Sequence, residues 1–216
     1  MPSESRPFAE PRGRFVVLDG PDGGGKTTQV ARLVEWLRSR GLEVVACRDP
    51  GGTAIGEKLR AILLDRGDSP PAMRTEMLLF MAARAQLVSE VIEPALERGA
   101  IVVSDRFLLA NIVYQGHAGG LSVEELRTVG RIAVNGLAPD LTMILDLPVE
   151  LGRARVGSAR DRLEDRSDDY HRAVRNGFLE ELETLQGASM VIDASCDPET
   201  VTTRIRAEVS RVLAID

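Results

Sequence analysis

The stretch Phe15-Val-Val-Leu-Asp-Gly20-Pro-Asp-Gly-Gly-Gly25-Lys26-Thr27-Thr28 decides the fold of this 216-residue chain. It opens with a short apolar run, which predicts a buried β-strand. After it, residues 20–27 satisfy the pattern G-x-x-x-x-G-K-[ST] in full. From Lys26 onward apolar side chains recur with the spacing of one helix face, at Val30, Leu33, Val34 and Leu37. A strand, a glycine-rich loop and a helix in direct succession predict a loop whose backbone N–H groups bind phosphate.

The residue types of this loop indicate a nucleoside triphosphate as the ligand. We expect Lys26 to reach the terminal phosphates and Thr27 to place its hydroxyl on Mg²⁺. Asp105 ends a second apolar run, 101–105, and is expected to hold the same ion as a Walker B carboxylate. The alternatives are a plain glycine-rich turn and an aspartate that only caps the turn after its strand. The expected ATP-binding residues are Gly20, Pro21, Asp22, Gly23, Gly24, Gly25, Lys26, Thr27 and Thr28.

Short apolar runs alternate with amphipathic segments along the rest of the chain. We expect further strands over 42–47, 101–103, 141–147 and 190–192, and helices over about 54–64, 72–98, 122–137 and from about 198. Pro94 is expected to mark a kink in the second of these helices or the start of another helix, and Ser122 to cap the third. The alternation predicts an α/β fold with a five-stranded parallel sheet flanked by helices. We expect one domain over 14–216, after a disordered tail over 1–13.

Composition excludes several classes of protein. A net charge of −6 and a pI near 5.2 argue against a protein that holds nucleic acid by its phosphates. The sequence has neither a run of the ~20 apolar residues that a membrane span needs nor the apolar core of a signal peptide. Its two cysteines lack metal-ligand or redox spacing. No N-K-x-D stretch occurs, which disfavours a GTPase. We therefore expect a cytoplasmic protein without nucleic-acid or membrane partners.

Five motifs follow one another in a fixed order. They are Gly23-Gly-Gly-Lys-Thr-Thr28, Arg48-Asp-Pro-Gly-Gly-Thr53, Leu78-Leu-Phe-Met-Ala-Ala-Arg84, Asp105-Arg-Phe107 with Tyr114-Gln-Gly116, and Asn135-Gly-Leu-Ala-Pro-Asp-Leu-Thr142. In type and order they resemble the bacterial thymidylate kinase family, P-loop enzymes that phosphorylate dTMP with ATP. The resemblance runs from residue 14 to the C-terminal segments and implies a nucleoside monophosphate kinase fold of the P-loop NTPase class.

The resemblance also implies an acceptor site. Phe80 and Arg84 lie four residues apart and share one helix face; in the family the ring stacks on thymine and the arginine binds the base. Taken alone, such a Phe would be read as core and such an Arg as solvated. Asn111 and Gln115 would contact the base, and Tyr114 would crowd a ribose 2′-hydroxyl. Asp22 matches an acidic residue near the acceptor. Arg48, Arg60 and Arg106 match positions that bind the acceptor phosphate.

The chain departs from the family pattern at two motif positions. Asp49 stands where the family usually has Glu, which shortens the side chain by one methylene, and is still expected at the acceptor site. Phe107 stands where it usually has Tyr, which removes a hydroxyl. Neither change touches the expected phosphate-binding residues, so we expect activity to persist.

An arginine-rich stretch over about 153–169 resembles the lid of bacterial family members. Asp161-Arg162-Leu163-Glu164 is similar to their D-R-x-E. The phosphate loop carries no arginine, so we expect the lid to supply a cation to the γ-phosphoryl, from Arg162 first, then Arg160 and Arg155. The alternative is an ordinary solvated, ion-paired surface.

These observations predict a dTMP kinase that transfers the γ-phosphoryl of ATP to dTMP, giving dTDP and ADP in dTTP biosynthesis. The expected catalytic residues are Lys26, Arg162, Arg160, Arg155 and Asp105. No general base is required, because the acceptor phosphate is already anionic. One alternative is a kinase for another nucleotide or a nucleoside, although a nucleoside kinase would not need the arginines of the acceptor phosphate. A non-catalytic nucleotide-binding module is the other. The resemblance alone implies a homodimer.

Overall fold

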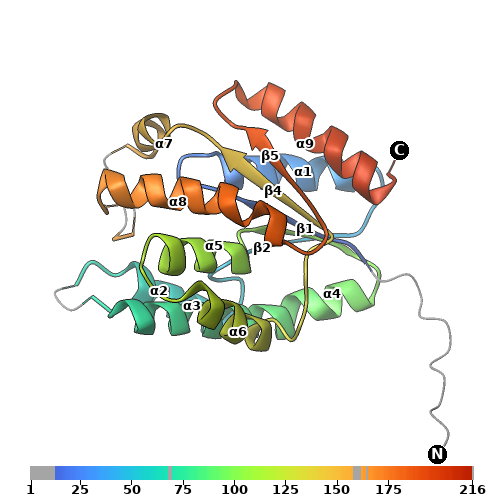
Figure 1. The fold of residues 1–216 in the computed structure, drawn as a ribbon. Helices are drawn as coiled ribbons and strands as arrows, with labels where there is room; N and C mark the ends of the chain where they lie inside the picture. The colour runs from blue at the N-terminus through green and yellow to red at the C-terminus, as the bar shows by residue number, and fades with distance from the viewer. Residues whose placement is uncertain (1–12, 68–69, 158–161, 164, 216) are drawn as a thin grey trace, which may run out of the picture.

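The computed structural model describes residues 13–67, 70–157, 162–163 and 165–215. Helices surround a central sheet on both faces (Figure 1). The expected disordered tail falls almost wholly outside the described residues. Gly13, the first described residue, is buried and its N–H donates to the carbonyl of Leu96. The expectation of a single domain over 14–216 stays a prediction.

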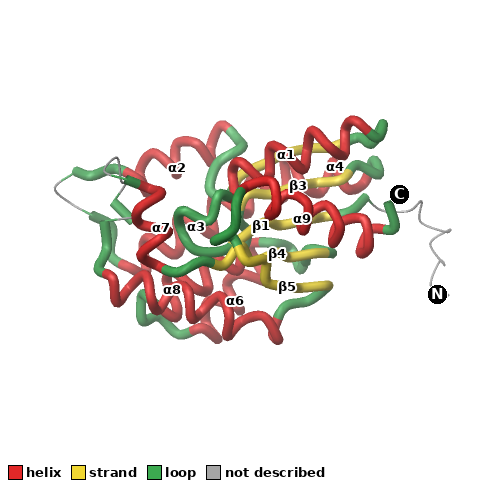
Figure 2. The backbone as a smooth tube through the Cα atoms, turned by 90° about the horizontal axis from the view of Figure 1, so that it is seen from above, coloured by secondary structure: helices red, strands yellow, loops and turns green. Residues whose placement is uncertain are grey.

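The sheet has five parallel strands in the order β2-β3-β1-β4-β5, and Figure 2 shows them side by side. The strands are β1 (Phe15–Asp19), β2 (Val44–Arg48), β3 (Ile101–Asp105), β4 (Leu141–Asp146) and β5 (Ala188–Asp193). All residues of the central strand β1 are buried, as expected for a parallel strand covered on both faces. The predicted five-stranded parallel α/β fold is confirmed.

Two layers of helices cover the sheet. On one face, α1 (Lys26–Ser39) and α9 (Pro198–Leu213) pack an aliphatic core against β1 and β4. On the other face lie α3 (Met73–Leu87), π-helix η1 (Val88–Ile92) and α4 (Glu93–Glu97). The remaining helices are α2 (Ala54–Leu64), α5 (Leu108–Asn111), π-helix η2 (Ile112–His117), α6 (Val123–Ala133), α7 (Val149–Val156), α8 (Asp168–Glu180) and 3₁₀-helix η3 (Glu181–Thr184).

Helix starts were predicted better than helix ends. Helix α2 has the predicted bounds, and Ser122 caps α6 by accepting from the N–H of Glu125. Pro94 marks a second helix, as one of the two expectations had it: it lies in the first turn of α4, which follows the π-helical segment η1. Helix α6 ends at Ala133 rather than near residue 137, because Asn135 and Gly136 adopt positive φ angles of 51° and 71°.

The segment after β3 is helical, although no helix was predicted there from the sequence. Residues 108–117 are helical, as α5 followed by η2. Because Asn111 and Gln115 are four residues apart on this helical segment, their amides lie close enough to hydrogen bond. Helical backbone therefore places Asn111, Tyr114 and Gln115 at the site.

Candidate active site

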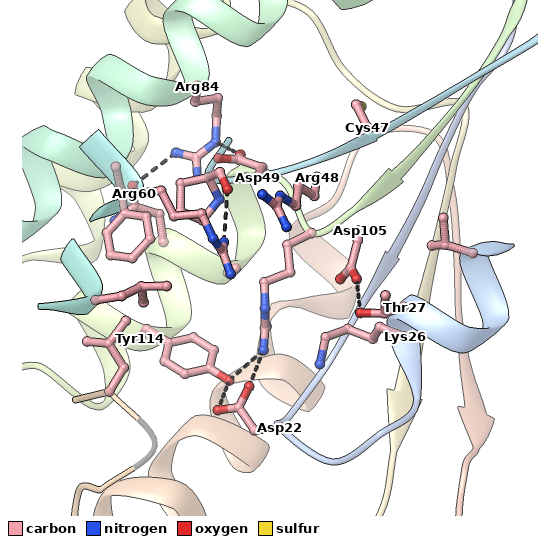
Figure 3. Close-up of a pocket in the computed structure, with 18 of the residues that line it drawn as sticks. Asp22, Lys26, Thr27, Cys47, Arg48, Asp49, Arg60, Arg84, Asp105 and Tyr114 are labelled. Carbon is pink, nitrogen blue, oxygen red and sulfur yellow. Dashed lines mark hydrogen bonds and ion pairs between the residues drawn. The ribbon is translucent and has the colours of Figure 1, made fainter. Parts of the chain in front are cut away.

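Polar side chains gather at the carboxyl ends of β1, β2 and β3, where ligands bind in open parallel sheets. They line a cavity of about 430 Å³ (Figure 3). Of the predicted site residues, the cavity is lined by Asp22, Gly23, Gly25, Lys26, Thr27, Thr28, Arg48, Asp49, Arg60, Phe80, Arg84, Asp105, Arg106, Asn111, Tyr114 and Gln115. Gly20, Pro21 and Gly24 complete the loop between β1 and α1 without lining the cavity.

The glycine-rich loop needs its glycines for two reasons. Gly20 and Gly23 have φ angles of 127° and 79°, a region that other residues rarely adopt. A Cβ on Gly23 would lie 2.3 Å from the carbonyl oxygen of Gly152 in α7. The loop ends at Gly25, directly before the first turn of α1, so its N–H groups surround the helix N-terminus.

Lys26 is buried beside this loop. Its Nζ donates to the carbonyls of Gly20 over 3.1 Å and Pro21 over 2.7 Å. Burial lowers the pKa of Lys26 to about 8, and the positive charge of Arg106 adds to the effect. Nearby carboxylates, including Asp22 and Asp105, oppose this shift. The ammonium group is thus held, poorly solvated, at the place where an anionic ligand would stabilise it.

Thr27 and Asp105 converge from α1 and the end of β3. The hydroxyl of Thr27 donates to Oδ2 of Asp105 over 2.6 Å (Figure 3). A hydroxyl and a carboxylate oxygen are hard ligands, and Mg²⁺ is commonly held by one or two such groups together with phosphates and water. In the described part of the chain no three His, Cys, Asp or Glu side chains form a metal site of their own. The pair therefore fits a magnesium ion shared with a nucleotide.

Arg106 links the phosphate loop to the helical segment after β3. Its φ is 70°, and its guanidinium donates to the carbonyl of Gly20 and to both Asp22 and Tyr114. The Tyr114 hydroxyl in turn donates to Asp22 over 2.9 Å. Burial works against the ionised form of Asp22, but Arg106 and Lys26 outweigh it and lower the pKa of this carboxyl. Asp22 is thus an anion fixed between a guanidinium and a phenol.

Arg84 lines the cavity with only 1% of its surface exposed. Its Nε donates to Asp49 over 2.5 Å, and its Nη1 donates to the amide oxygen of Asn111 over 2.9 Å. Phe107 packs in a T-shaped contact with Phe15, so this departure from the family pattern lies in the hydrophobic core. The reading of Arg84 as a solvated surface residue is excluded.

The other acceptor-side residues are more open. Phe80 is partly exposed and lines the cavity one helical turn before Arg84. Arg48 is half-exposed and pairs with Glu57 over 2.8 Å. Arg60 donates to the carbonyl of Pro50 over 2.9 Å. The cavity that Phe80 and Arg84 line thus also carries Arg48, Arg60 and Arg106.

The lid arginines lie elsewhere. Arg162 is held by the carboxylate of Glu76 over 2.7 Å and by the carbonyl of Leu63 over 2.9 Å, and is not among the residues lining the cavity. Arg155 donates to the carbonyls of Ala194 over 2.8 Å and Gly23 over 3.4 Å, so it touches the back of the phosphate loop. Arg160 lies outside the described residues.

Sequence reasoning missed two buried carboxylates near the site. Asp19 ends β1 and is fully buried; its Oδ1 accepts from the N–H of Gly20, and burial raises its pKa to about 6 although Arg106 and Lys26 oppose the shift. Glu76 is fully buried in α3 and faces Arg162. The sequence offered one signal for Glu76: it is an acidic residue among the apolar positions of a predicted helix, directly before Met77.

Known proteins match the chain over most of its length. A family model described as thymidylate kinase matches residues 18–205. The chain belongs to the thymidylate kinase family. Curated relatives named thymidylate kinase include one from Rhodopirellula baltica, 47% identical over 95% of this chain and 84% of its own length. Another, from Desulforudis audaxviator, is 46% identical over 93% of this chain and 92% of its own. A third, from Pseudomonas putida, is 43% identical over 90% of this chain and 94% of its own length.

Membership of the thymidylate kinase family makes the chain a phosphotransferase with nucleotide-binding sites. The site agrees with this membership, since one cavity is lined both by the phosphate loop and by several arginines outside the loop. Among the described residues no helix is both long and apolar enough to cross a bilayer.

Proposed function

We propose that this chain transfers the γ-phosphoryl group of ATP to dTMP, giving dTDP and ADP in the supply of dTTP. One observation carries the proposal: a single cavity joins the phosphate-loop residue Lys26 to a base end built from Phe80 and Arg84. A nucleotide switch would need the loop but not the base end. The names of the relatives, at 42–47% identity, support dTMP as the acceptor.

The acceptor's base lies between Phe80 and Arg84 in this proposal. The ring provides a stacking surface, worth roughly 1–3 kcal/mol per base in proteins that stack nucleobases. The guanidinium of Arg84 donates to a carbonyl at position 4 of thymine and meets repulsion from the amino group of cytosine. Asn111 can still accept from thymine N3–H, because its amide oxygen has a second lone pair beside Arg84.

The acceptor phosphate lies among Arg48, Arg60 and Arg106. Guanidinium forks suit a dianion, because each offers several N–H donors in fixed directions. Asp22 belongs to the loop, and Arg106 and Tyr114 fix its carboxylate. In that place it orients the acceptor's sugar, while the Tyr114 ring leaves room for deoxyribose but not for a 2′-hydroxyl.

Transfer is in-line: an oxygen of the dTMP phosphate bonds to the γ-phosphorus as the bond to the ADP oxygen breaks. Lys26 neutralises charge on the transferred group, and the loop N–H groups orient the β-phosphate. Thr27 and Asp105 would hold Mg²⁺, which neutralises phosphate charge when bound. No residue needs to take a proton, since the attacking oxygen is already ionised.

The lid over about 153–169 supplies the remaining positive charge. Arg155 already reaches the phosphate loop, and Arg162 reaches the γ-phosphoryl if it leaves Glu76 and Leu63. Arg160 is a further candidate for this contact with the γ-phosphoryl group. Arginines that stabilise phosphoryl transfer in this way contribute roughly 10³–10⁵-fold in rate.

We place the protein in the cytoplasm as a homodimer without nucleic-acid partners. Apolar side chains support the dimer: Leu78 of α3 is 50% exposed and Ile132 of the adjacent α6 is 77% exposed. Exposed apolar residues on neighbouring helices commonly mark an interface.

The test is an ADP-release assay with ATP and Mg²⁺, in which dTMP, dUMP, dCMP, dAMP, dGMP and thymidine are offered in parallel. Turnover mainly on dTMP, with dUMP weaker, is expected. Turnover on thymidine or dCMP but not on dTMP would overturn the substrate, and ATP binding without turnover on any acceptor would favour a binding module. Removal of Mg²⁺ with a chelator should abolish turnover.

A further inference from the structure

Glu76 is a buried carboxylate that the proposed reaction leaves without a task. Its side chain is fully buried in α3, yet it accepts hydrogen bonds from three different side chains. Arg162 donates to Oε2 over 2.7 Å, and Arg166 donates to Oε2 over 3.0 Å and to Oε1 over 3.1 Å. Gln115 donates to Oε1 over 2.9 Å. Burying a carboxylate costs desolvation free energy, so a carboxylate kept at this place is expected to have a function.

The hydrogen bonds continue from Glu76 to the base end of the cavity. Gln115 accepts through Oε1 from Nδ2 of Asn111 over 2.6 Å, and Asn111 accepts through Oδ1 from Arg84 over 2.9 Å. Arg84 ends the series on Asp49. The series therefore runs from the lid to the side chains expected to read the base.

The chemistry of the two ends fixes the orientation of both amides. A carboxylate can only accept, so the Gln115 group that faces Glu76 must be its NH₂. That turns the Gln115 oxygen toward Asn111, which must then present its own NH₂. A guanidinium can only donate, so Arg84 requires the Asn111 oxygen on its side. Glu76 and Arg84 thus favour the same orientation, with the Asn111 oxygen facing the position of thymine N3–H.

A second contact brings the lid to the same place. Arg166 lies over the ring of Tyr170 at 4.5 Å, and the Tyr170 hydroxyl donates to the backbone carbonyl of Tyr114 over 2.7 Å. Arg166 and Tyr170 therefore hold the backbone beside Gln115, while Glu76 holds the side chain of Gln115.

We propose that Glu76 is a positioning residue that sets the orientation of Gln115 and Asn111 for the base and couples it to the docking of Arg162 and Arg166. The inference rests on the proposed dTMP kinase activity and deepens it. Because Glu76 acts through other residues, it contributes to recognition of the acceptor without touching it.

Glu76→Gln is the test, since it keeps the shape of the side chain but places an NH₂ group among three donors. We expect the dTMP KM to rise about tenfold and the preference for dTMP over dCMP to narrow. Glu76→Asp keeps the charge. We expect it to recover part of the affinity for dTMP and part of the preference for dTMP over dCMP. Glu90→Gln in η1 makes the same change of charge at an exposed site, and its KM should stay within about twofold of the wild type.

Tryptic cleavage after Arg162 and Arg166 measures the docking of the lid separately. In the wild type dTMP should slow this cleavage, and in Glu76→Gln that protection should be lost. If the variant merely folds less well, its kcat per total protein falls while the dTMP KM, the base preference and the protection by dTMP stay unchanged. That result would overturn the inference. Wild-type turnover on dTMP, measured beside it, separates this failure from a failure of the proposed activity.

Arg166→Gln provides a second route should Glu76→Gln not fold. Arg166 is at the surface end of the series, with 20% of its side chain exposed, and does not line the cavity. The inference predicts a rise of about threefold or more in the dTMP KM, although Arg166 touches no expected ligand. An unchanged KM would contradict the coupling.

Discussion

Asp49 and Arg84 form an ion pair that solvent does not reach. The pair spans 2.5 Å between Nε and Oδ2, with side-chain exposures of 0% for Asp49 and 1% for Arg84. Burial raises the pKa of the Asp49 carboxyl, and Arg84 opposes the rise. Asp49, which is one methylene shorter than the Glu usual in the family, thus contacts Arg84 from the end of β2. Its task in this chain is to orient Arg84 and to compensate the buried positive charge of its guanidinium.

Asp49→Asn should therefore weaken the fold as well as the acceptor site. Removing one partner of a buried ion pair leaves the other uncompensated and typically costs roughly 3–5 kcal/mol. We expect a loss of that size in the free energy of unfolding, measured by urea denaturation. Asp169→Asn removes an exposed partner of Arg172 and should change stability by about 1 kcal/mol or less. Equal effects of the two substitutions would contradict this account of Asp49.

Phe80 provides a test of base stacking that is nearly independent of folding. Its ring is partly exposed at the cavity, so Phe80→Leu removes a stacking surface with little change in the core. Stacking worth roughly 1–3 kcal/mol corresponds to a rise of about 5- to 150-fold in the dTMP KM. Steady-state kinetics with dTMP varied at saturating ATP measure it. Phe80→Trp should retain most of the affinity, and a dTMP KM unaffected by Phe80→Leu would remove the ring from the base site.

Tyr114 is expected to select the sugar through its ring and to fix Asp22 through its hydroxyl. Tyr114→Phe removes the hydrogen bonds to Asp22 and Arg106 but keeps the ring. We expect it to lower kcat/KM for dTMP about tenfold, as for the loss of a bond to a charged group, while the preference for dUMP over UMP persists. Tyr114→Ala should in addition lose that preference. Retention of the preference by Tyr114→Ala would show that another group excludes the ribose.

The sheet and the phosphate loop could be predicted because their signals are local. The run before Gly20 and the helical spacing after Lys26 each lie within one element, and propensity and period decide such elements. The helical form of 108–117 could not be read in the same way, since α5 is only four residues long and the segment packs against α3, α6 and α8. The partners of Arg162 are also non-local: 86 residues separate it from Glu76, and no spacing in the sequence connects them.

Asp19 should make stability depend on pH. Its native pKa of about 6 lies above the ordinary value of 3.8, mainly because of burial. The stability that this group contributes is therefore fully present below pH 3.8 and is lost as the pH rises through about 6. Two pKa units correspond to roughly 3 kcal/mol. Asp19→Asn removes this dependence, so its stability relative to the wild type should increase by about that amount from pH 4 to pH 7 in urea denaturation.

A constant difference between Asp19→Asn and the wild type would mean that the native carboxyl titrates near its ordinary value.

Lys26 should couple nucleotide binding to proton uptake. With a pKa of about 8, set by burial and by Arg106, it is about half protonated at pH 8 in the free protein. Phosphates placed against it favour the charged form, so binding of ATP at pH 8 should take up about 0.5 proton per molecule, and at pH 7 only about 0.1. Calorimetry in two buffers of different ionisation enthalpy measures this number directly. A binding enthalpy independent of the buffer at pH 8 would show that Lys26 is already fully protonated before the nucleotide arrives, and that the loop carbonyls of Gly20 and Pro21 compensate for its burial.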